Sequence, residues 1–237
     1  MSGAIYPTLT RQSGLLREMT VIAQNIANAS TTGYRGEALV FSEHVVASGH
    51  GVPSVSMAKA AGKLTDLGQG ALEKTGGAWD LAIEGEGFFL VGVDGEPHLT
   101  RAGAFLPGPD GLLTTPEGHA LLDEGGAPMA LPDGAGDVRV APDGTVSADG
   151  QPVGRVAVVM PDDPGAMSRR AGTMFAAEGW TPVEDPRVAQ GFLEASNVDP
   201  VLQVARMVAV QNAYQAGQGF MDREDERSRS MLRLMDR

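Results

Sequence analysis

Two segments at opposite ends of the chain carry apolar residues at alternating spacings of four and three. The first runs from Ile5 to Ile26, and the second runs from Met207 to Met235, with polar Glu224 and Ser228 in two of its positions. This spacing keeps one set of side chains on one face of an α-helix and is typical of helices that pack against other helices. Neither apolar face can remain in water. The sequence therefore predicts two long terminal helices that need partners.

The first helix is predicted to end near Asn28 and before Gly33, because Ser and Thr at 30–32 favour a chain break. The second is predicted to begin at Asp199 and Pro200, since Asp is a good N-cap and Pro is favoured at the first helical position. The predicted stripes are Ile5, Leu9, Gln12, Leu16, Met19, Ala23 and Ile26 in the first helix, and Met207, Val210, Tyr214, Gly217, Met221, Met231 and Met235 in the second.

Between the helices, from about Gly36 to Gln190, the helical period disappears and Gly and Pro become frequent. Short apolar runs alternate with Asp-Gly dipeptides, which tolerate the positive φ angles of tight hairpins. This pattern predicts antiparallel strands. The predicted strands are 81–83, 87–93, 99–105, 112–115, 138–141, 145–148 and 155–160, and the predicted turns are Asp94-Gly95, Asp110-Gly111, Asp143-Gly144 and Asp149-Gly150.

Together these zones predict an α+β fold. The long N- and C-terminal helices pack as a coiled-coil-like pair, and a mainly antiparallel β-domain is inserted between them. Two interpretations stay open: the helices satisfy each other within one chain, or their remaining surface also packs on neighbouring copies and the protein polymerises. The expected divisions are 1–35 for the N-terminal helix and its motif, 36–78 for an extended connector, 79–190 for the β-domain and 191–237 for the C-terminal helix.

The formal net charge of −12 lies almost entirely in the middle of the chain. An acidic, solvated centre argues against binding to nucleic acid or to an anionic membrane, which both require clustered Lys and Arg. No apolar stretch is long enough to predict a transmembrane helix, and no cleaved signal peptide is predicted. Cysteine is absent, which excludes disulfides and thiolate metal sites.

Motifs for catalysis or metal binding are not found in the sequence. Most acids lie in Asp-Gly turns, which explains them without the paired carboxylates of a glycosidase. His44, His50, His98 and His119 lack zinc-site spacing, and segment 143–150 lacks calcium-loop spacing. We expect no catalytic residue, metal or cofactor. A β-domain enzyme or adhesion module with a helical stalk is the alternative class.

Residues 24–35, Gln-Asn-Ile-Ala-Asn-Ala-Ser-Thr-Thr-Gly-Tyr-Arg, resemble the N-terminal signature of flagellar rod and hook proteins. That signature reads Asn-[Leu/Ile]-Ala-Asn, two variable residues, Thr, one variable residue, Gly and an aromatic residue, usually followed by a base. Residues 191–199, Gly-Phe-Leu-Glu-Ala-Ser-Asn-Val-Asp, are similar to the C-terminal signature of the same family. Segments 80–90 and 100–105 resemble its β-domain motifs, in the same order.

The resemblance implies a structural, non-enzymatic subunit of the flagellar basal-body rod, with terminal helices around an axial channel. Asn25 and Asn28 are expected to hydrogen-bond neighbouring backbone, Gly33 to supply a left-handed or close-approach position, and Ser196, Asn197 and Asp199 to fix the start of the second helix. The residues expected at subunit contacts are Leu16, Met19, Asn25, Ile26, Asn28, Gly33, Tyr34, Ser196, Asn197, Val198, Asp199, Met207, Gln211 and Tyr214.

The implied partners are other copies of the chain, other proximal and distal rod subunits, and the flagellar type III export apparatus. Nucleic acid and direct membrane insertion are not expected. The implied location is the basal body, where the rod crosses the periplasm and transmits torque from motor to hook. The chain length and the short 36–78 segment favour the proximal-rod type, with the distal-rod type as the alternative.

Overall fold

The computed structural model describes residues 5–46, 55–132, 134 and 136–235, which form two compact units. We call them the helical unit and the β-unit. The helical unit comprises Met1–Ala27, Glu37–Leu64 and Asp199–Arg237, and the β-unit comprises Asn28–Gly36 and Thr65–Val198.

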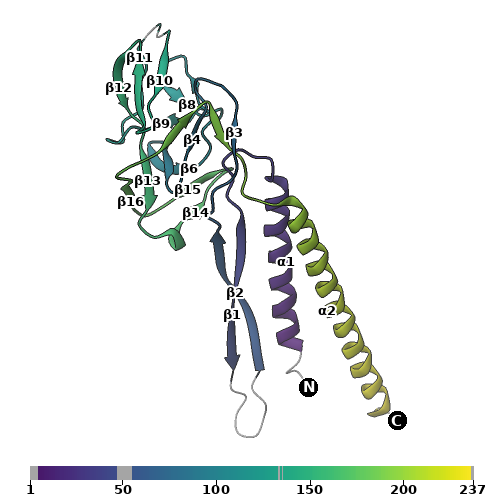
Figure 1. The fold of residues 1–237 in the computed structure, drawn as a ribbon. Coiled ribbons are helices and arrows are strands. Elements are labelled where there is room, and N and C mark those ends of the chain that lie inside the picture. Colours follow the sequence, from purple (N-terminus) through teal and green to yellow (C-terminus); the bar gives the residue numbers. More distant parts are fainter. Residues whose placement is uncertain (1–4, 47–54, 133, 135, 236–237) are drawn as a thin grey trace. The chain divides into compact units, whose positions relative to one another are not determined.

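The helical unit contains α1 (Ile5–Ala27), β1 (Glu37–Val46), β2 (Val55–Thr65) and α2 (Pro200–Met235). The two helices lie side by side and run in opposite directions, and the paired strands β1 and β2 lie next to α1 (Figure 1). Within the described residues, no helix has both the length and the hydropathy needed to cross a membrane.

The predicted start of α2 is confirmed. Asp199 Oδ1 accepts hydrogen bonds from Val201 N at 2.9 Å and Leu202 N at 3.0 Å, and Pro200 is the first helical residue. The predicted face of α2 is also confirmed in the part that lies against α1. Its inward side chains, buried or half-buried at spacings of four and three, are Gln203, Met207, Val210, Tyr214, Gly217 and Met221.

The predicted face of α1 is only partly right. Leu9 and Leu16 are 50% and 48% exposed, and Ala23 is exposed as well, whereas Leu15 is half-buried and Ile22 is buried. Apolar residues occupy both the exposed and the buried positions, so the apolar stripe of α1 is wider than the face that packs on its neighbours. The spacing alone therefore does not reveal which edge of the stripe turns inward. The remaining predicted positions, Gln12, Met19 and Ile26, are buried or half-buried, and the side chain of Ile5 lies outside the described residues.

Within the segment predicted as an extended connector, 36–78, the structure has β1, β2 and β3 (Leu72–Lys74), and β3 pairs with β18 (Phe192–Glu194). Its Gly-, Ala- and Ser-rich sequence gives no clear alternation, so these strands have little local signal. The divisions differ too, because residues 28–36 and 191–198 both belong to the β-unit.

The β-unit is built on an antiparallel sheet whose central strand is β5 (Phe88–Val93). One edge of β5 pairs with β6 (Glu96–Thr100), and the other pairs with β13 (Val158–Pro161) and β9 (Ala120–Leu121). The sheet also contains β7 (Leu106–Pro107), β8 (Leu113–Thr114), β14 (Ser168–Arg169), β15 (Met174–Ala176) and β16 (Trp180–Pro182).

Three smaller pairings complete this unit. The first is a three-stranded sheet, the second joins β4 to β17, and the third is the β3–β18 pair. Pro164–Ala166 form a short 3-10 helix. The strands of the first two pairings are β10 (Val138–Val140), β11 (Thr145–Ala148), β12 (Gln151–Arg155), β4 (Leu81–Ile83) and β17 (Val188–Gln190).

Side chains of β5 fill the cores on both faces of the sheet. Phe89 and Val91 belong to one buried cluster, and Phe88 and Leu90 belong to another. This alternation follows the two-residue period of a strand. It explains why the apolar run of β5 is continuous: both faces are covered.

Two predicted strands end differently in the structure. The strand predicted over 99–105 stops at Thr100, and the chain then runs close to β4, where Leu81 N donates to Gly103 O at 2.9 Å. The strand predicted over 155–160 divides into β12 and β13, which belong to different sheets. The glycine of each predicted Asp-Gly turn is left-handed, with φ of 84° at Gly95, 72° at Gly111, 84° at Gly144 and 81° at Gly150. The aspartate is left-handed as well only at Asp94 (51°) and Asp149 (50°) among the four turns.

Candidate assembly site

The backbone after α1 passes very close to another segment of the β-unit at Gly33. Gly33 has φ of +68°, a left-handed conformation that glycine adopts readily. A Cβ atom here would lie 2.2 Å from Ala102 N, so a larger residue requires the backbone to move. Gly33 N donates to Glu194 O at 2.7 Å. This contact brings the N-terminal and C-terminal signatures together.

Arg35 and Glu194 form a fully buried ion pair. Arg35 Nη1 lies 2.7 Å from Glu194 Oε1, and both side chains are 0% exposed. Arg101 Nη1 lies 3.1 Å from Glu194 Oε2. Two guanidinium groups therefore share one carboxylate inside the β-unit. Because isolated charges are costly to bury, both arginines depend on Glu194.

Arg101 has several further partners. Its Nη2 donates to Gly85 O at 2.6 Å and its Nη1 donates to Ile83 O at 3.3 Å. Its Cζ lies 5.4 Å from the centroid of the Phe88 ring. Burial lowers the pKa of Arg101 to about 10, with Glu194 opposing this change and Arg35 adding to it. Arg101 is therefore still charged at neutral pH.

Arg35 has fewer hydrogen bonds. Its Nε and Nη2 have no hydrogen-bond partner among the described residues, and its Nη1 approaches Glu194 outside hydrogen-bond geometry. Glu194 Oε1 also accepts from Gly70 N at 2.8 Å. The charge of Glu194 is thus the main compensation for burying Arg35.

Asn197 connects three backbone segments of the β-unit. Its Oδ1 accepts from Gly36 N at 2.7 Å, and its Nδ2 donates to Asp66 O at 3.0 Å and Gly68 O at 2.8 Å. Its backbone N donates to Tyr34 O at 3.3 Å. An amide is required here, because the side chain donates and accepts at the same time.

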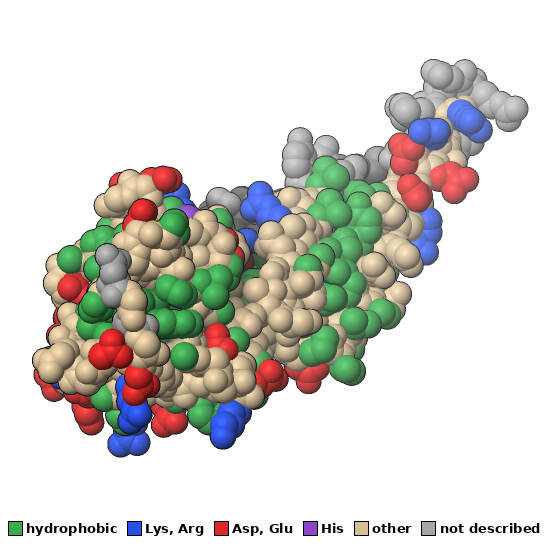
Figure 2. All heavy atoms as spheres, turned by 90° about the horizontal axis from the view of Figure 1, so that it is seen from above, with side chains coloured by type: hydrophobic (Ala, Val, Ile, Leu, Met, Phe, Trp, Pro, Cys, Tyr) green, Lys and Arg blue, Asp and Glu red, His purple; other side chains and the backbone are tan. Residues whose placement is uncertain are grey.

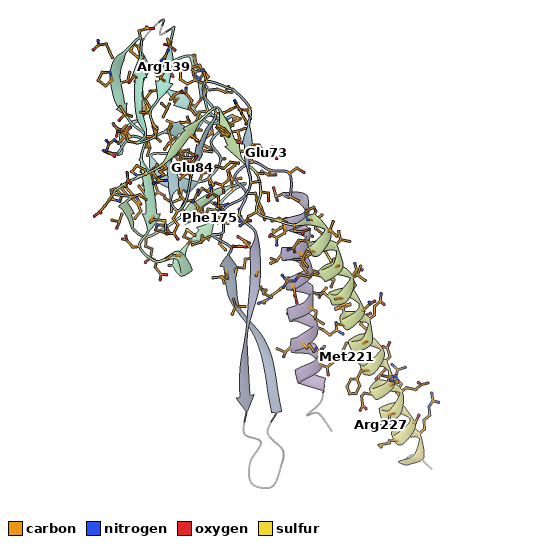
Figure 3. The ribbon with its side chains drawn as sticks, in the orientation of Figure 1. Glu73, Glu84, Arg139, Phe175, Met221 and Arg227 are labelled. Atoms are coloured by element: carbon orange, nitrogen blue, oxygen red, sulfur yellow. The ribbon has the colours of Figure 1, made fainter. Side chains whose placement is uncertain are left out.

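Tyr34 is buried beneath a stacked arginine. The Cζ of Arg169 lies 4.4 Å from the Tyr34 ring centroid and 4.5 Å from that of Phe175. Arg169 also donates to the backbone oxygens of Arg35 and, at 2.9 Å, Gly172. Phe175 comes from β15 and appears inside the β-unit in Figure 3. The N-terminal signature is thereby packed on the main sheet.

In the helical unit, the side chain of Asn25 makes the two backbone hydrogen bonds to Glu37 that a neighbouring strand would otherwise make. Its Nδ2 donates to Glu37 O at 2.8 Å and its Oδ1 accepts from Glu37 N at 3.0 Å. Asn25 Nδ2 also lies 3.5 Å from Gln203 Oε1. One buried amide therefore connects α1, the start of β1 and α2.

Gly217 provides space for Gln12 where the two helices face each other. Gln12 Nε2 donates to Tyr214 O at 2.9 Å, and a Cβ atom on Gly217 would lie 2.3 Å from that nitrogen. Gln12 Oε1 is buried without a hydrogen-bond partner among the described residues. A groove of about 360 Å³ lies here, between Thr8 and Leu15 of α1 and the facing part of α2.

Both helices keep exposed apolar side chains outside their contact with each other, Leu9 and Leu16 on α1 among them. On α2 these are Val201, Val204 and Val208, which are 77%, 51% and 51% exposed. Figure 2 shows hydrophobic side chains along the helices and charged ones gathered at the far end of α2. In Figure 3, Met221 lies level with the beginning of α1, while Arg227 lies beyond it. Among the described residues, the charged side chains of this projecting end pair within α2 itself, Arg227 with Glu224 and Arg229 with Asp225.

Models of three protein families match the chain in the order of its elements. They are the flagella basal body rod protein at residues 8–35, the flagellar hook protein FlgE/F/G D1 domain at residues 82–148, and the flagellar basal body rod FlgEFG protein C-terminal at residues 189–234. The flagellar basal-body rod protein FlgF of Caulobacter vibrioides is 37% identical over 98% of this chain and 97% of its own. The chain belongs to the FlgF family of flagellar basal-body rod proteins.

A second FlgF, from Mesorhizobium japonicum, is 36% identical over 91% of this chain and 90% of its own. The distal alternative is less similar: FlgG of Bacillus subtilis is 25% identical over 99% of both chains. FlgF is the proximal rod subunit of the flagellar basal body. The predicted function as a structural rod protein of the bacterial flagellum is therefore confirmed.

In this FlgF family member, the residues predicted at subunit contacts separate into two groups. Met19, Asn25, Ile26, Met207 and Tyr214 are buried or half-buried in the helical unit, whereas Leu16 and Gln211 are exposed there. The other predicted residues are those of the two signatures. They are Asn28, Gly33, Tyr34, Ser196, Asn197 and Val198 in the β-unit, and Asp199 at the start of α2.

The signature residues differ in how far they follow the prediction. Asp199 caps α2 as expected, and Ser196 Oγ accepts from Val198 N at 3.2 Å. Asn197 does not fix the helix start; its side chain bonds to Gly36, Asp66 and Gly68 instead. Asn28 O accepts from Thr31 N at 3.0 Å and forms the turn after α1.

Sequence reasoning missed Arg35, Arg101, Arg169 and Glu194. Three of them lie inside quoted motifs, because Arg35 ends the N-terminal signature, Arg101 lies in segment 100–105 and Glu194 lies in segment 191–199. The available signal was a charged residue inside a motif whose other residues are suited to packing. Arg169 had no such signal.

Proposed function

We propose that this chain is a proximal-rod subunit that associates with further copies of itself and with other rod and hook proteins. The observation that carries the proposal is the set of large apolar side chains that stay exposed on α1 and α2. A soluble monomer has little reason to expose Val201, Val204 and Val208 in a row along one helix face. Packing between copies would bury them.

Within each subunit, the proposed helix pairing is coiled-coil-like. The inward residues of α2 from Gln203 to Met221 follow the four-three spacing that such packing requires. Gln12 and Asn25 add polar contacts to this interface, and polar groups at such positions are known to set register. The helical ends thereby reach a defined alignment before or during assembly.

Delivery and location follow from membership in the family. We infer that the flagellar type III apparatus exports the chain and that the assembled rod crosses the periplasm. The residues proposed for subunit packing are Leu16 and Gln211 directly, with the buried members of the predicted set holding the contact surfaces in shape. A catalytic role is not part of the proposal, since the family is one of structural rod proteins.

Deletion of the gene followed by isolation of basal bodies tests the placement. We expect assembly to stop at an early rod stage, before the distal rod and hook, and peptide mapping of wild-type basal bodies to recover this chain. Basal bodies from the deletion strain with a complete rod and only the hook missing would contradict proximal placement. Absence of the chain from intact wild-type particles would contradict the structural role itself.

A further inference from the structure

The main sheet of the β-unit carries a cleft of about 450 Å³ over β6, β14 and β15, lined by His98, Ala176 and Ser168 among others. Ser168 lies directly opposite Ala176. The register between β15 and β6, continued by one residue from the pair of Phe175 and Leu99, places Ala176 opposite His98. Residues opposite each other share a face of a sheet. The three side chains therefore form one row across three strands, and the small Ala176 leaves space at its centre.

His98 is only 8% exposed, and it lines this cleft. Its Nδ1 lies 3.2 Å from the backbone oxygen of Glu96, and because a carbonyl oxygen can only accept, Nδ1 carries the hydrogen. The neutral ring then has a free lone pair on Nε2, which has no hydrogen-bond partner among the described residues. A nearly buried acceptor without a partner is costly. An N–H group that enters the cleft can supply the missing donor.

The two ends of the cleft carry charges of opposite sign. Arg170 N donates to Met174 O at 3.0 Å, so Arg170 lies on the Met174 side of the row. Glu96 and Glu178 lie on the other side, and four residues along the strands separate Glu96 from the level of Arg170, roughly 13 Å. Within the part of the chain that the structure describes, these three charged groups form no ion pair. A ligand with one cationic and one anionic end complements this arrangement.

We propose that the cleft binds a short peptide that has a free ammonium group, a free carboxylate and small side chains. Arg170 pairs with the carboxylate, and Glu96 and Glu178 pair with the ammonium group. Between the two ends, His98 Nε2 accepts from a peptide N–H, and Ser168 Oγ donates to a peptide carbonyl oxygen. Every polar group of the peptide thus has a partner of the right kind.

The size of the cleft favours a peptide of about three residues. Three extended residues span about 10 Å, which with a hydrogen bond at each end matches the length of the row. The floor includes Ala166, Ala176 and Ala177, which can pack against methyl groups. All lining residues belong to the β-unit, so this binding site is separate from the helix packing of the rod.

A nuclear magnetic resonance titration of the isotope-labelled full chain tests the site with three probes. They are trialanine, its N-acetylated form and its C-terminal amide. Trialanine is expected to shift the amide signals of residues 96–98, 166–170 and 176–178, with a dissociation constant on the order of 1 mM for a ligand of this size. Each blocked form lacks one charge-assisted hydrogen bond and should bind about tenfold more weakly or worse.

Exposed substitutions assign the two ends of the peptide without disturbing the core. Arg170→Gln should bind trialanine as weakly as the wild type binds the amide, and its affinity for the amide should stay the same. The double variant Glu96→Gln with Glu178→Gln should show the same pattern with the acetylated form. The matched control is Arg139→Gln, an exposed arginine of β10 outside the cleft (Figure 3), which should bind all three probes as the wild type does.

Absence of shifts around the cleft at tens of millimolar trialanine would overturn the proposal. Equal affinity of the wild type for the three probes would overturn it as well, because the charged ends would then not select the ligand. The same holds for a loss of binding in Arg139→Gln that equals the loss in Arg170→Gln.

Discussion

Arg35 and Glu194 come from the two ends of the chain and meet as a buried ion pair at 2.7 Å. Glu194 also pairs with Arg101, so a single carboxylate compensates two guanidinium groups. The two sequence signatures are therefore joined by charge as well as by the Gly33 and Asn197 backbone contacts.

Replacing Glu194 by Gln should destabilise the β-unit by about 3–5 kcal/mol, because both arginines then remain buried without an opposite charge. Urea unfolding of the full chain, followed by tryptophan fluorescence, measures this directly, since Trp79 and Trp180 both belong to the β-unit. The matched control is Glu124→Gln, which removes the exposed pair with Arg155 and should cost less than about 1 kcal/mol. Equal losses in the two variants would contradict the assignment.

Gly33→Ala should be much more disruptive than Gly118→Ala. Both positions have positive φ, +68° at Gly33 and +90° at Gly118. A left-handed alanine lowers the free energy of unfolding by about 1–2 kcal/mol at each. Only at Gly33 does the added Cβ meet backbone, at 2.2 Å from Ala102 N, whereas nothing lies within 4 Å at Gly118. The difference in urea midpoint between the variants measures the close approach, and matching midpoints would show that the segments can separate freely.

Asn25→Asp should release the start of β1 from α1. The substitution removes the donor to Glu37 O and places a carboxylate against that oxygen, a loss of about 1–3 kcal/mol for a buried group. Hydrogen exchange of the Glu37 amide should become at least about tenfold faster. Gln211→Glu, an exposed change of the same type on α2, should leave that amide unchanged; an unaltered rate in Asn25→Asp would contradict the strand-like role.

Arg101→Lys should make the stability of the β-unit depend on pH below pH 10. Burial already lowers the pKa of Arg101 to about 10, and lysine starts from a lower ordinary value of about 10.4. The pKa of the buried lysine is then below that in the unfolded chain, so the unfolded state binds more protons in this window. Stability relative to wild type should rise with pH as the buried lysine loses its charge.

Urea midpoints of the variant and of wild type, measured from pH 7 to about 9, test this effect. The wild-type arginine should contribute little slope in this range, because a pKa of about 10 leaves it charged there. Parallel curves for the two proteins would show that position 101 is not effectively buried.

The sequence predicted those features that depend on local chemistry. Asp199 and Pro200 mark the start of α2 because capping is a matter of adjacent residues. The Asp94 and Asp149 turns are equally local, since a left-handed residue followed by glycine needs no distant partner. The inward face of α2 could be predicted around Tyr214, where the exposed neighbours Asn212 and Gln215 are polar.

Features that depend on distant contacts could not be predicted in this way. Leu15 and Leu16 are equally apolar, and only the position of α2 decides that Leu16 remains exposed. Glutamate usually lies on the protein surface. The burial of Glu194 depends on its ion pairs with Arg35 and Arg101, which come from other segments of the chain. Asn197 was assigned to the helix start because its real partners, Asp66 and Gly68, are remote in sequence.

When a chain appears from its N-terminus onward, the contacts between the two signatures can form only in a fixed order. Gly33, Tyr34 and Arg35 come out early, but their partners Glu194 and Asn197 follow only after every strand of the main sheet. Closing the long loop between Arg35 and Glu194 costs conformational entropy, which grows slowly with loop length. Only the last contacts, those of Glu194 and Asn197, offset this cost. Until then residues 33–35 lack their contacts with Glu194 and Asn197. The β-unit can therefore be completed only after nearly the whole chain has emerged.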